Sequence, residues 1–498
     1  MSGPPPVLDR VREHARHLTR FGRPPVVRCG RPIRSSGPAS VADSSERHPH
    51  TAYTGGFAPA SRVEGGHIIG LSEVRTDVYT TWTPRRRRAA RPLTALVAAT
   101  ALGAGTLGAA QAAPRSSDDT IRVTYRGYEF AVPAGWDVID LDKDPGACVR
   151  FDQHAVYLGT PGDRQDCPAR AKGRTEALLV QPAEAATAEV TENRTAGTYR
   201  AVADQIAVTA AYGQDREQIQ EILRGAGLPV ASARAESGAE VPAAPAVPDD
   251  ATTFKGKGFD ACTAPSQASM DAWKGTSGYG AIGVYVGGVN RACAQPKLTA
   301  KWVQTQYANG WRFFPLYVGR QPSADGGSCL GGCASITDPE PQGKDAADDA
   351  VRQAAAVGFG PGSVIYNDLE HYAGGTAVTT RVLTYLESWT TRLHELGYRS
   401  GAYGSVSSLI TDLVKHADDR TLPDVIHFAH WNDEATTTDP VLPADLWADH
   451  QRIHQYAGNR TETHGGVKIS IDRNKLDVGS GTGKRSSIER GPSQLMSR

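Results

Sequence analysis

The sequence has no excess of charge of either sign, because 54 Lys+Arg balance 54 Asp+Glu. A nucleic-acid-binding protein needs an electropositive surface, so this balance argues against that class of partner. After residue 113 the sequence also lacks an apolar run long enough to cross a bilayer. It contains no Cys-x-x-Cys pair, so we predict neither a zinc site nor any other metal or cofactor. What remains is a chain of 498 residues, enough for two or three soluble domains.

The N-terminal end divides into two segments. Residues 1–84 are rich in Arg, Pro, Ser, Gly and His without apolar periodicity, which predicts disorder. Residues 85–112 begin with "RRRR", continue with an Ala/Leu/Gly-rich stretch and end in "AQA", the pattern of a secretory signal peptide. We therefore expect export, with a mature chain that starts close to Ala113. A signal peptide belongs at a true N-terminus, so we expect translation to start near Val74 or Val78. A signal anchor with an N-terminal tail is the alternative.

Cysteine usage agrees with export. Apart from Cys29, an even number of cysteines remains, and in an exported chain this predicts disulfides. They are Cys148, Cys167, Cys262, Cys293, Cys329 and Cys333. Sequence alone leaves the pairing open, although proximity favours joining each cysteine to its neighbour in this order, first to second, third to fourth and fifth to sixth.

Two folded regions follow. Residues 119–228 contain short strand-like runs, a hairpin pattern around Arg126–Gly127 and one helix-like segment, which predicts a small α+β domain without a recognisable chemical motif. Residues 229–253 are rich in Ala, Pro and Glu and predict a linker. Residues 254–479 are predicted to form the second domain, and residues 480–498 a disordered tail.

Short apolar runs recur through the second domain, and helix-like segments occupy most gaps between them. Alternation of near-continuous apolar strands with helices is typical of a parallel sheet. Eight such runs predict an α/β fold, a (β/α)8 TIM-type barrel. The segment "GNRTETHGG" before the last strand is too short and too polar for a helix. We therefore expect the barrel to be irregular near its last strands.

Two carboxylates interrupt the apolar run "VIYNDLEHY" at residues 364–372. Because residues two apart on a strand point to the same side, Asp368 and Glu370 are predicted to follow Val364 and Tyr366 into the barrel interior. The acids come last along the strand. They are therefore expected at the C-terminal rim, where barrels of this kind carry active sites.

Two other predicted strands end in an acid, Asp260 and Asp472. Four acids on one rim would repel one another, so at least one should keep its proton at higher pH. A protonated acid beside a carboxylate can protonate a glycosidic oxygen and stabilise an oxocarbenium-like transition state. Taken singly, a strand-end Asp is more often a turn former or helix cap, and D-x-E also fits a solvated rim or a salt-bridge network. Agreement among three strand ends favours a site.

Polar and aromatic residues near other strand ends are candidates for contact with a sugar. They are Gln455, Tyr456, Trp431, Tyr285, His430 and Asn474. For the three aromatic side chains, packing at the barrel mouth is the alternative. His427 and His430 lie three apart on a predicted strand and face opposite sides, which argues against a metal pair.

Several stretches of the second domain carry a resemblance to a known family. They are "GFDACTAPS", "YGAIGVYVGG", "VIYNDLEHY", "HQRIHQY" and "GGVKISIDRN". Through them, residues 258–478 resemble the actinobacterial glycoside-hydrolase-like domain family, which has a TIM-barrel fold and no settled activity. The region is also similar to family-25 lysozymes, which cleave peptidoglycan. Those enzymes share an early strand-end Asp, a D-x-E on the fourth strand, a late Gln-Tyr and a final Asp-x-Asn.

The resemblance implies roles for the matching residues. Glu370 would be the proton donor, Asp368 would orient or stabilise, and Gln455 with Tyr456 would line the sugar site. Asp260 and Asp472 would complete the acidic cluster. The sequence departs from the lysozymes at "HFAHWN", where they carry an aromatic-Ala-aromatic pattern, and in its Cys-bearing loops and the insertion "GGSCLGGCASITDPEPQGKDAADD". These departures bear on the substrate.

Three functional hypotheses follow. The first is a secreted, monomeric glycoside hydrolase that acts on peptidoglycan or a related cell-envelope glycan. The second is a carbohydrate-binding or wall-binding module on a catalytically silent barrel, because fold and site shape do not guarantee turnover. The third is a different hydrolase or a wall-assembly partner.

Overall fold

The computed structural model describes residues 119–184, 188–230, 243–322 and 332–480. All described residues belong to one unit of the chain, Leu107–Arg498. The predicted signal peptide and C-terminal tail lie outside the described residues, apart from Ser480 of the tail. Among the described residues, no helix is both long enough and apolar enough to span a membrane.

The first module begins with the hairpin expected at Arg126–Gly127. Strands β1 (Thr120–Tyr125) and β2 (Tyr128–Pro133) pair antiparallel, and both turn residues have positive φ, 46° and 85°. A mixed six-stranded sheet follows. In spatial order it contains β3 (Asp137–Asp140), β4 (Ala155–Leu158), β5 (Ala177–Pro182), β8 (Ile206–Ala211), β7 (Thr198–Ala203) and β6 (Glu189–Asn193).

One helix completes the core of this module. Helix α1 (Arg216–Gly225) starts at Asp215, whose side chain accepts a hydrogen bond from the Gln218 backbone N–H. This cap satisfies a donor that the first helical turn leaves unpaired. The apolar face of α1 carries Ile219, Ile222 and Leu223, which pack with side chains of both sheets.

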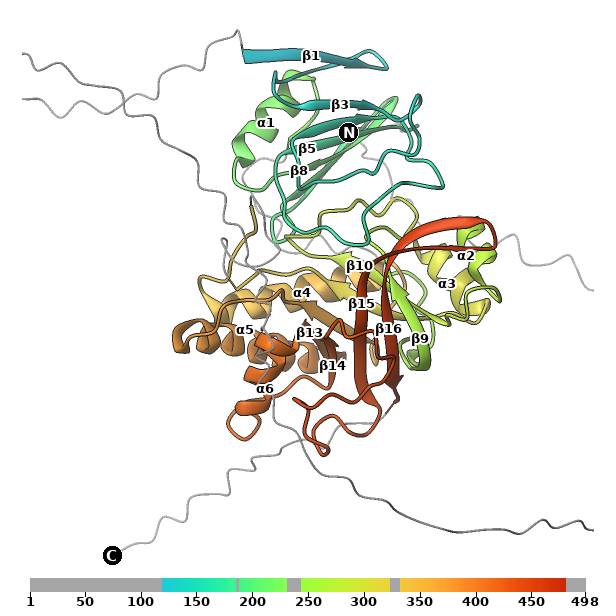
Figure 1. The fold of residues 1–498 in the computed structure, drawn as a ribbon. Helices are drawn as coiled ribbons and strands as arrows, with labels where there is room; N and C mark the ends of the chain where they lie inside the picture. Colours follow the sequence, from blue (N-terminus) through green and yellow to red (C-terminus); the bar gives the residue numbers. More distant parts are fainter. Residues whose placement is uncertain (1–118, 185–187, 231–242, 323–331, 481–498) are drawn as a thin grey trace, which may run out of the picture. The chain divides into compact units, whose positions relative to one another are not determined.

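The second module is a closed eight-stranded barrel (Figure 1). Its strands are β9 (Phe254–Asp260), β10 (Ala281–Gly287), β11 (Arg312–Tyr317), β12 (Val364–Asp368), β13 (Arg399–Ser405), β14 (Val425–Ala429), β15 (Gln451–His464) and β16 (Val467–Val478). Neighbours from β9 to β15 pair parallel, whereas β16 pairs antiparallel with both β15 and β9.

Within the described part of the chain, helices follow only the first five barrel strands. They are α2 (Gln267–Trp273), α3 (Ala300–Ala308), α4 (Pro339–Ala356), α5 (Thr376–Glu395) and α6 (Thr411–Lys415). A short 3-10 helix, η2 (Asp249–Thr252), precedes β9, and a π-helical turn, η3 (Val406–Ile410), precedes α6. Residues 430–450, all of them described, connect β14 to β15 without a helix.

The prediction of an alternating (β/α)8 TIM-type barrel is therefore wrong. The barrel is mixed, and the described residues contain six α-helices, one of them in the first module. The polar segment "GNRTETHGG", judged too short and too polar for a helix, extends β15 and turns at Gly465–Gly466 into β16. A two-residue turn joins antiparallel strands, whereas a parallel crossover needs a much longer connection. The turn glycines have φ of 56° and 76°, which suits such a turn.

Strand alternation sorts side chains into two layers, as predicted for β12. Val364 and Tyr366 belong to the cluster inside the barrel, while Ile365 and Leu369 pack in the layer under the helices. Gly401 on β13 makes room for the Tyr366 ring, because a Cβ there would lie 2.3 Å from it. The interior is thus filled by side chains below the rim where the acids lie.

Candidate active site

The four predicted acids converge at one end of the barrel. Asp260 and Asp368 are the last residues of β9 and β12, and Glu370 follows two residues later. Asp472 pairs directly with Asp260 across β16 and β9. All four are buried, with exposed fractions of 5% or less.

The route by which Asp472 reaches this rim differs from the prediction. It was expected at the C-terminal end of a parallel strand, but it lies in the middle of the long antiparallel β16. The first half of β16 continues past the rim together with β15 as a hairpin. The tip of this hairpin contacts α2, where the Trp273 indole N–H donates to the Val467 carbonyl (2.9 Å).

Asp260 is held by three donors. The Tyr285 hydroxyl donates to Oδ1 (3.1 Å), and the amides of Asn474 (2.7 Å) and Gln455 (3.3 Å) donate to Oδ2. Burial, together with the nearby charge of Asp472, raises the pKa of Asp260 to about 7 despite these hydrogen bonds. Burial also raises the pKa of Asp472, whose Oδ1 accepts from the Asn459 backbone N–H (2.6 Å).

Gln455 links the acids to the aromatic side chains of the rim. Its Oε1 accepts from the Tyr403 hydroxyl (3.0 Å) and from the Trp431 indole N–H (3.1 Å). These two donors fix the orientation of the amide, so that Nε2 points at Asp260. Tyr403 was not predicted as a site residue, although it lies on the buried strand β13 two residues after Gly401, where a side chain faces the same side.

A second glutamine fixes the D-x-E stretch. The Gln321 amide donates to the Asp368 carbonyl (2.8 Å), and its Oε1 accepts from the Glu370 backbone N–H (2.8 Å). The chain is therefore held rigidly between the two acids. Burial raises the pKa of Asp368. Gln321 carries no signal in the sequence, because its role depends on a turn between β11 and α4.

His427 supports the site without facing substrate. It is fully buried, and its Nε2 lies 2.7 Å from Asn474 Oδ1. Burial lowers the pKa of His427 to about 3, so the ring is neutral. Because Oδ1 can only accept, His427 carries its proton on Nε2. This contact turns the Asn474 amide so that its N–H group faces Asp260.

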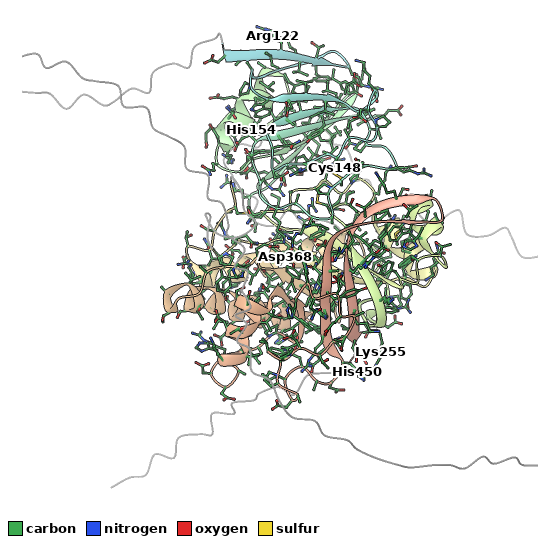
Figure 2. The ribbon with its side chains drawn as sticks, viewed as in Figure 1. Arg122, Cys148, His154, Lys255, Asp368 and His450 are labelled. Atoms are coloured by element: carbon green, nitrogen blue, oxygen red, sulfur yellow. A yellow bond between two sulfur atoms is a disulfide. The ribbon has the colours of Figure 1, made fainter. Side chains whose placement is uncertain are left out.

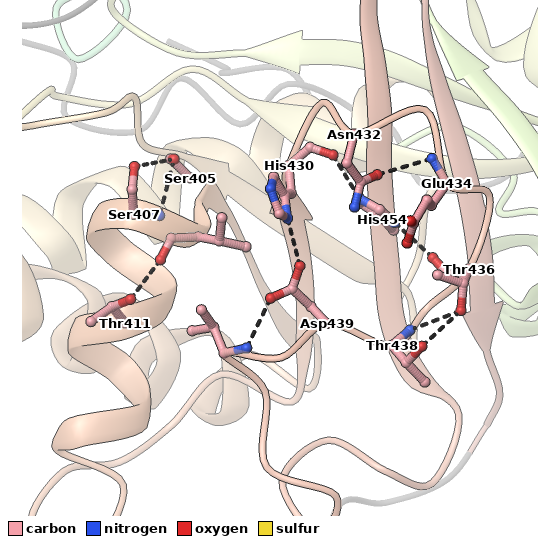
Figure 3. A network of polar contacts seen from close by, with 12 residues as sticks. Ser405, Ser407, Thr411, His430, Asn432, Glu434, Thr436, Thr438, Asp439 and His454 are labelled. Carbon is pink, nitrogen blue, oxygen red and sulfur yellow. Dashed lines mark hydrogen bonds and ion pairs between the residues drawn. The ribbon is translucent and has the colours of Figure 1, made fainter. Parts of the chain in front are cut away.

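Two predicted sugar contacts lie elsewhere. Tyr456 follows Gln455 on β15 and faces the opposite side, where its ring lies 6.1 Å from that of His454. The His430 imidazole pairs with Asp439 (2.7 Å) in the connection between β14 and β15, as Figure 3 shows. In the same network, His454 Nδ1 lies 2.7 Å from the Thr436 carbonyl oxygen. These contacts order the helix-free connection.

A lysine of the first module completes the site. The Lys172 ammonium forms ion pairs with Asp368 Oδ1 (3.3 Å) and with Glu370 Oε1. It also lies 5.3 Å from the centre of the Tyr403 ring. Burial lowers the pKa of Lys172. Nothing in the sequence around Lys172 indicated this contact. Figure 2 labels Asp368 in the barrel.

The neighbouring Arg170 covers the exposed aromatic side chain of the rim. Its guanidinium lies 4.4 Å from the centre of the Trp431 ring. Its charge also acts on Asp472 and Asp260. Trp431 keeps 43% of its surface exposed. The rim therefore has two cations from the first module set against its acids and its aromatic face.

Each module carries a disulfide close to the contact between them. Cys148 pairs with Cys167 in the first module, and Cys262 pairs with Cys293 in the barrel, the pairings that proximity favoured. The sulfur atoms of Cys148, Cys167 and Cys293 lie within 4.8 Å of one another. Cys333 is also disulfide-bonded, while Cys329 lies outside the described residues.

Residues 271–476 match the family model of the Rv2525c-like, glycoside hydrolase-like domain. This match confirms the resemblance to a glycoside-hydrolase-like domain family. The matched range starts after β9, so Asp260 lies just outside it. No curated protein sequence matches the chain.

The solved structures to which the chain is similar share little sequence with it. The Tat-secreted protein Rv2525c of Mycobacterium tuberculosis has 18% identity and a TM-score of 0.32, covering 45% of this chain and 96% of that one. An uncharacterised B. stearothermophilus protein has 15% identity and a TM-score of 0.30, covering 44% and 95%. The catalytic domain of endolysin ply40, from bacteriophage P40 of Listeria monocytogenes, has 13% identity and a TM-score of 0.29, covering 45% and 93%.

Proposed function

We propose that this glycoside hydrolase-like domain cleaves peptidoglycan or a related cell-envelope glycan. The observation that carries the proposal is the meeting of four buried carboxyl groups from three barrel strands at one rim. Their environments differ: Asp260 has a pKa raised to about 7, while Asp368 and Glu370 face a cation. Carboxyl groups held in different environments can divide the roles of acid and stabilising carboxylate. The match to a glycoside hydrolase-like family supports this reaction class.

Each acid has a proposed role in this chemistry. Glu370 donates its proton to the glycosidic oxygen as the bond to the anomeric carbon breaks. Asp368, fixed by Gln321, stabilises the positive charge that develops on the sugar. Water then adds to the anomeric carbon and its proton restores the acid. Asp260 and Asp472 complete the acidic cluster beside the sugar.

Binding of the sugar is assigned to the rim side chains that already hold the acids. Trp431 offers an exposed indole face on which a sugar ring can stack. Gln455 and Tyr285 present polar atoms next to Asp260. Asn474 contributes to the sugar site indirectly, because its amide donates to Asp260 and holds that acid in place. Tyr456 and His430 have no proposed contact with the sugar, because their side chains are engaged away from the acids.

We also propose that the protein is exported, as the signal-peptide pattern of residues 85–112 predicts. The disulfides Cys148–Cys167 and Cys262–Cys293 support this, because such bonds persist in oxidising compartments. N-terminal sequencing of the exported protein should begin close to Ala113. A mature chain that still contains residues 85–112 would contradict cleavage.

The test of the hydrolase uses the full chain with its lysine contact removed. Lys172→Ala and Lys172→Ala/Glu370→Gln are incubated with purified peptidoglycan, and new reducing ends and sedimentation are followed together. We expect reducing ends from the single variant and none from the double variant, with both sedimenting on the glycan. Absence of reducing ends from the single variant, folded and bound to the glycan, would contradict the proposal.

One observation favours a second candidate function, a wall-binding module on a silent barrel. Lys172 neutralises the same two acids that the hydrolase needs. Under this alternative, both variants sediment with the glycan but neither produces reducing ends. Binding would then depend on Trp431 and be lost in Trp431→Ala.

A further inference from the structure

We propose that residues 170–174 of the first module, the plug segment, close the carboxylate site of the barrel and must leave before a glycan can enter. This inference concerns the regulation of the proposed hydrolase and rests on that function for its meaning. That the segment covers the site is inferred from its contacts and distances alone. The plug segment carries three cations at alternate positions, Arg170, Lys172 and Arg174, and each has a different contact on the barrel.

Lys172 occupies the position that the scissile bond needs. Its side chain is only 3% exposed, and its ammonium lies between the carboxylates of Asp368 and Glu370. A glycosidic oxygen must come within hydrogen-bond distance of the acid that protonates it. The ammonium holds that place, and its positive charge favours the carboxylate form of an acid that must be protonated to act. The site is therefore blocked both sterically and electrostatically.

Arg170 occupies the aromatic platform in the same way. Its guanidinium stacks on Trp431, the exposed indole at the rim. A cation over an indole face is a favourable contact, and a sugar ring would have to displace it. One short segment thus covers both the catalytic acids and the stacking surface.

Arg174 anchors the plug segment to the barrel. Its guanidinium donates to the carbonyls of Val289 (2.9 Å), Gly288 (3.1 Å) and Arg291 (2.7 Å) in the loop after β10. The Gly173 N–H donates to the Asn290 carbonyl (3.0 Å), and Lys172 bridges to Arg291 as in an antiparallel strand pair. The segment is therefore joined to this loop by an isolated antiparallel bridge and a main-chain hydrogen bond.

Two disulfides lie beside the Arg170 end of this docked segment. Cys167, joined to Cys148, lies three residues before Arg170. It packs against Cys293, which is joined to Cys262 close after Asp260. Main-chain bonds extend the docking beside them, because the Phe151 N–H donates to the Ala292 carbonyl (2.8 Å).

The contacts of the plug are polar, which suits a cover that opens. Buried ion pairs contribute little net stability, because the charges regain hydration when they separate. Opening would return Lys172, Asp368 and Glu370 to water together, with no charge left buried alone. An apolar plug would lose its contacts without this compensation.

Carbodiimide chemistry on the folded full chain tests closure without any assay of activity. The reagent activates a carboxylate, which then forms an amide either with a neighbouring lysine amine or with added glycine ethyl ester. In the wild type we expect an amide between Lys172 and Glu370 or Asp368. Peptide mapping would detect it as a cross-linked pair of peptides whose combined mass is lower by one water. We expect these acids to react with glycine ethyl ester roughly tenfold or more slowly than the exposed Asp163.

Two variants make the result specific. In Lys172→Ala, glycine ethyl ester should label Glu370 and Asp368 at a rate that approaches that of Asp163. Lys143→Ala removes an exposed lysine of the same module and should behave as the wild type. If Lys172→Ala does not fold, as judged by circular dichroism, Arg174→Ala takes its place and is expected to expose the same acids.

The outcomes separate this inference from the proposed function. Rapid labelling of Glu370 in the wild type without a Lys172 amide would overturn the plug, whatever the enzymatic activity. Slow labelling in the wild type, fast labelling in Lys172→Ala and no hydrolysis by either would uphold the plug and refute the hydrolase.

Discussion

Asp260 is the acid whose environment is best defined by its contacts. Three hydrogen-bond donors surround its carboxyl group, yet burial and the neighbouring Asp472 raise its pKa to about 7. The folded state therefore keeps a proton that the unfolded chain releases near pH 4. The stability linked to this proton is fully present below pH 4 and is lost as the pH rises through 7.

We predict that Asp260→Asn weakens this pH dependence. Wild type should lose more free energy of unfolding than the variant between pH 4 and pH 8, by on the order of a few kcal/mol, because one pKa unit corresponds to about 1.4 kcal/mol. Urea denaturation at the two pH values measures the difference. Equal losses in both proteins would show that Asp260 titrates near its ordinary pKa.

Gly458 gives a second prediction at this scale. A Cβ at this position would lie 2.0 Å from the Trp431 indole. Gly458→Ala should therefore displace the ring from Gln455 and Arg170 and lower the free energy of unfolding by about 1–3 kcal/mol. Urea denaturation is the measurement. Gly374→Ala is the matched control, because a Cβ there meets no atom within 4 Å, and it should be nearly neutral.

At the scale of elements, sequence patterns located the barrel strands better than their directions. Apolar runs placed the Asp260, Asp368 and Asp472 stretches in strands of one barrel. They did not reveal that β16 runs antiparallel, because a long polar strand such as the end of β15 resembles a loop in sequence. The Asp472 side chain still reaches the rim, since register with β9 sets its level.

Arg174 joins the plug segment to the loop after β10 by three hydrogen bonds. Arg174→Ala should lower the free energy of unfolding by at least about 2 kcal/mol, because buried carbonyls that lose a donor carry a desolvation cost. Chemical denaturation checks this. Arg122, an exposed residue of β1, provides the matched control, and Arg122→Ala should change stability little. If Arg174→Ala lowers the free energy of unfolding no more than Arg122→Ala does, Arg174 does not anchor the plug segment.

At the scale of the whole molecule, the sequence predicted the acids but not what covers them. Residues of β9, β12 and β16 could be aligned because each strand carries its acid near a recognisable apolar run. The contact of Lys172 with those acids has no local pattern, because it joins segments far apart in the chain. Arg174 and Val289, for example, are 115 residues apart. Gln321 escaped prediction for the same reason.

The central claim is that a glycan-hydrolysing acid pair lies beneath a removable lysine. The most direct test compares the initial rates of reducing-end release from peptidoglycan by the full-length wild type and by Lys172→Ala. We predict a rate roughly tenfold or more higher for the variant, because its acids are no longer occupied. A variant rate equal to or below that of the wild type, with the variant folded, would contradict the account.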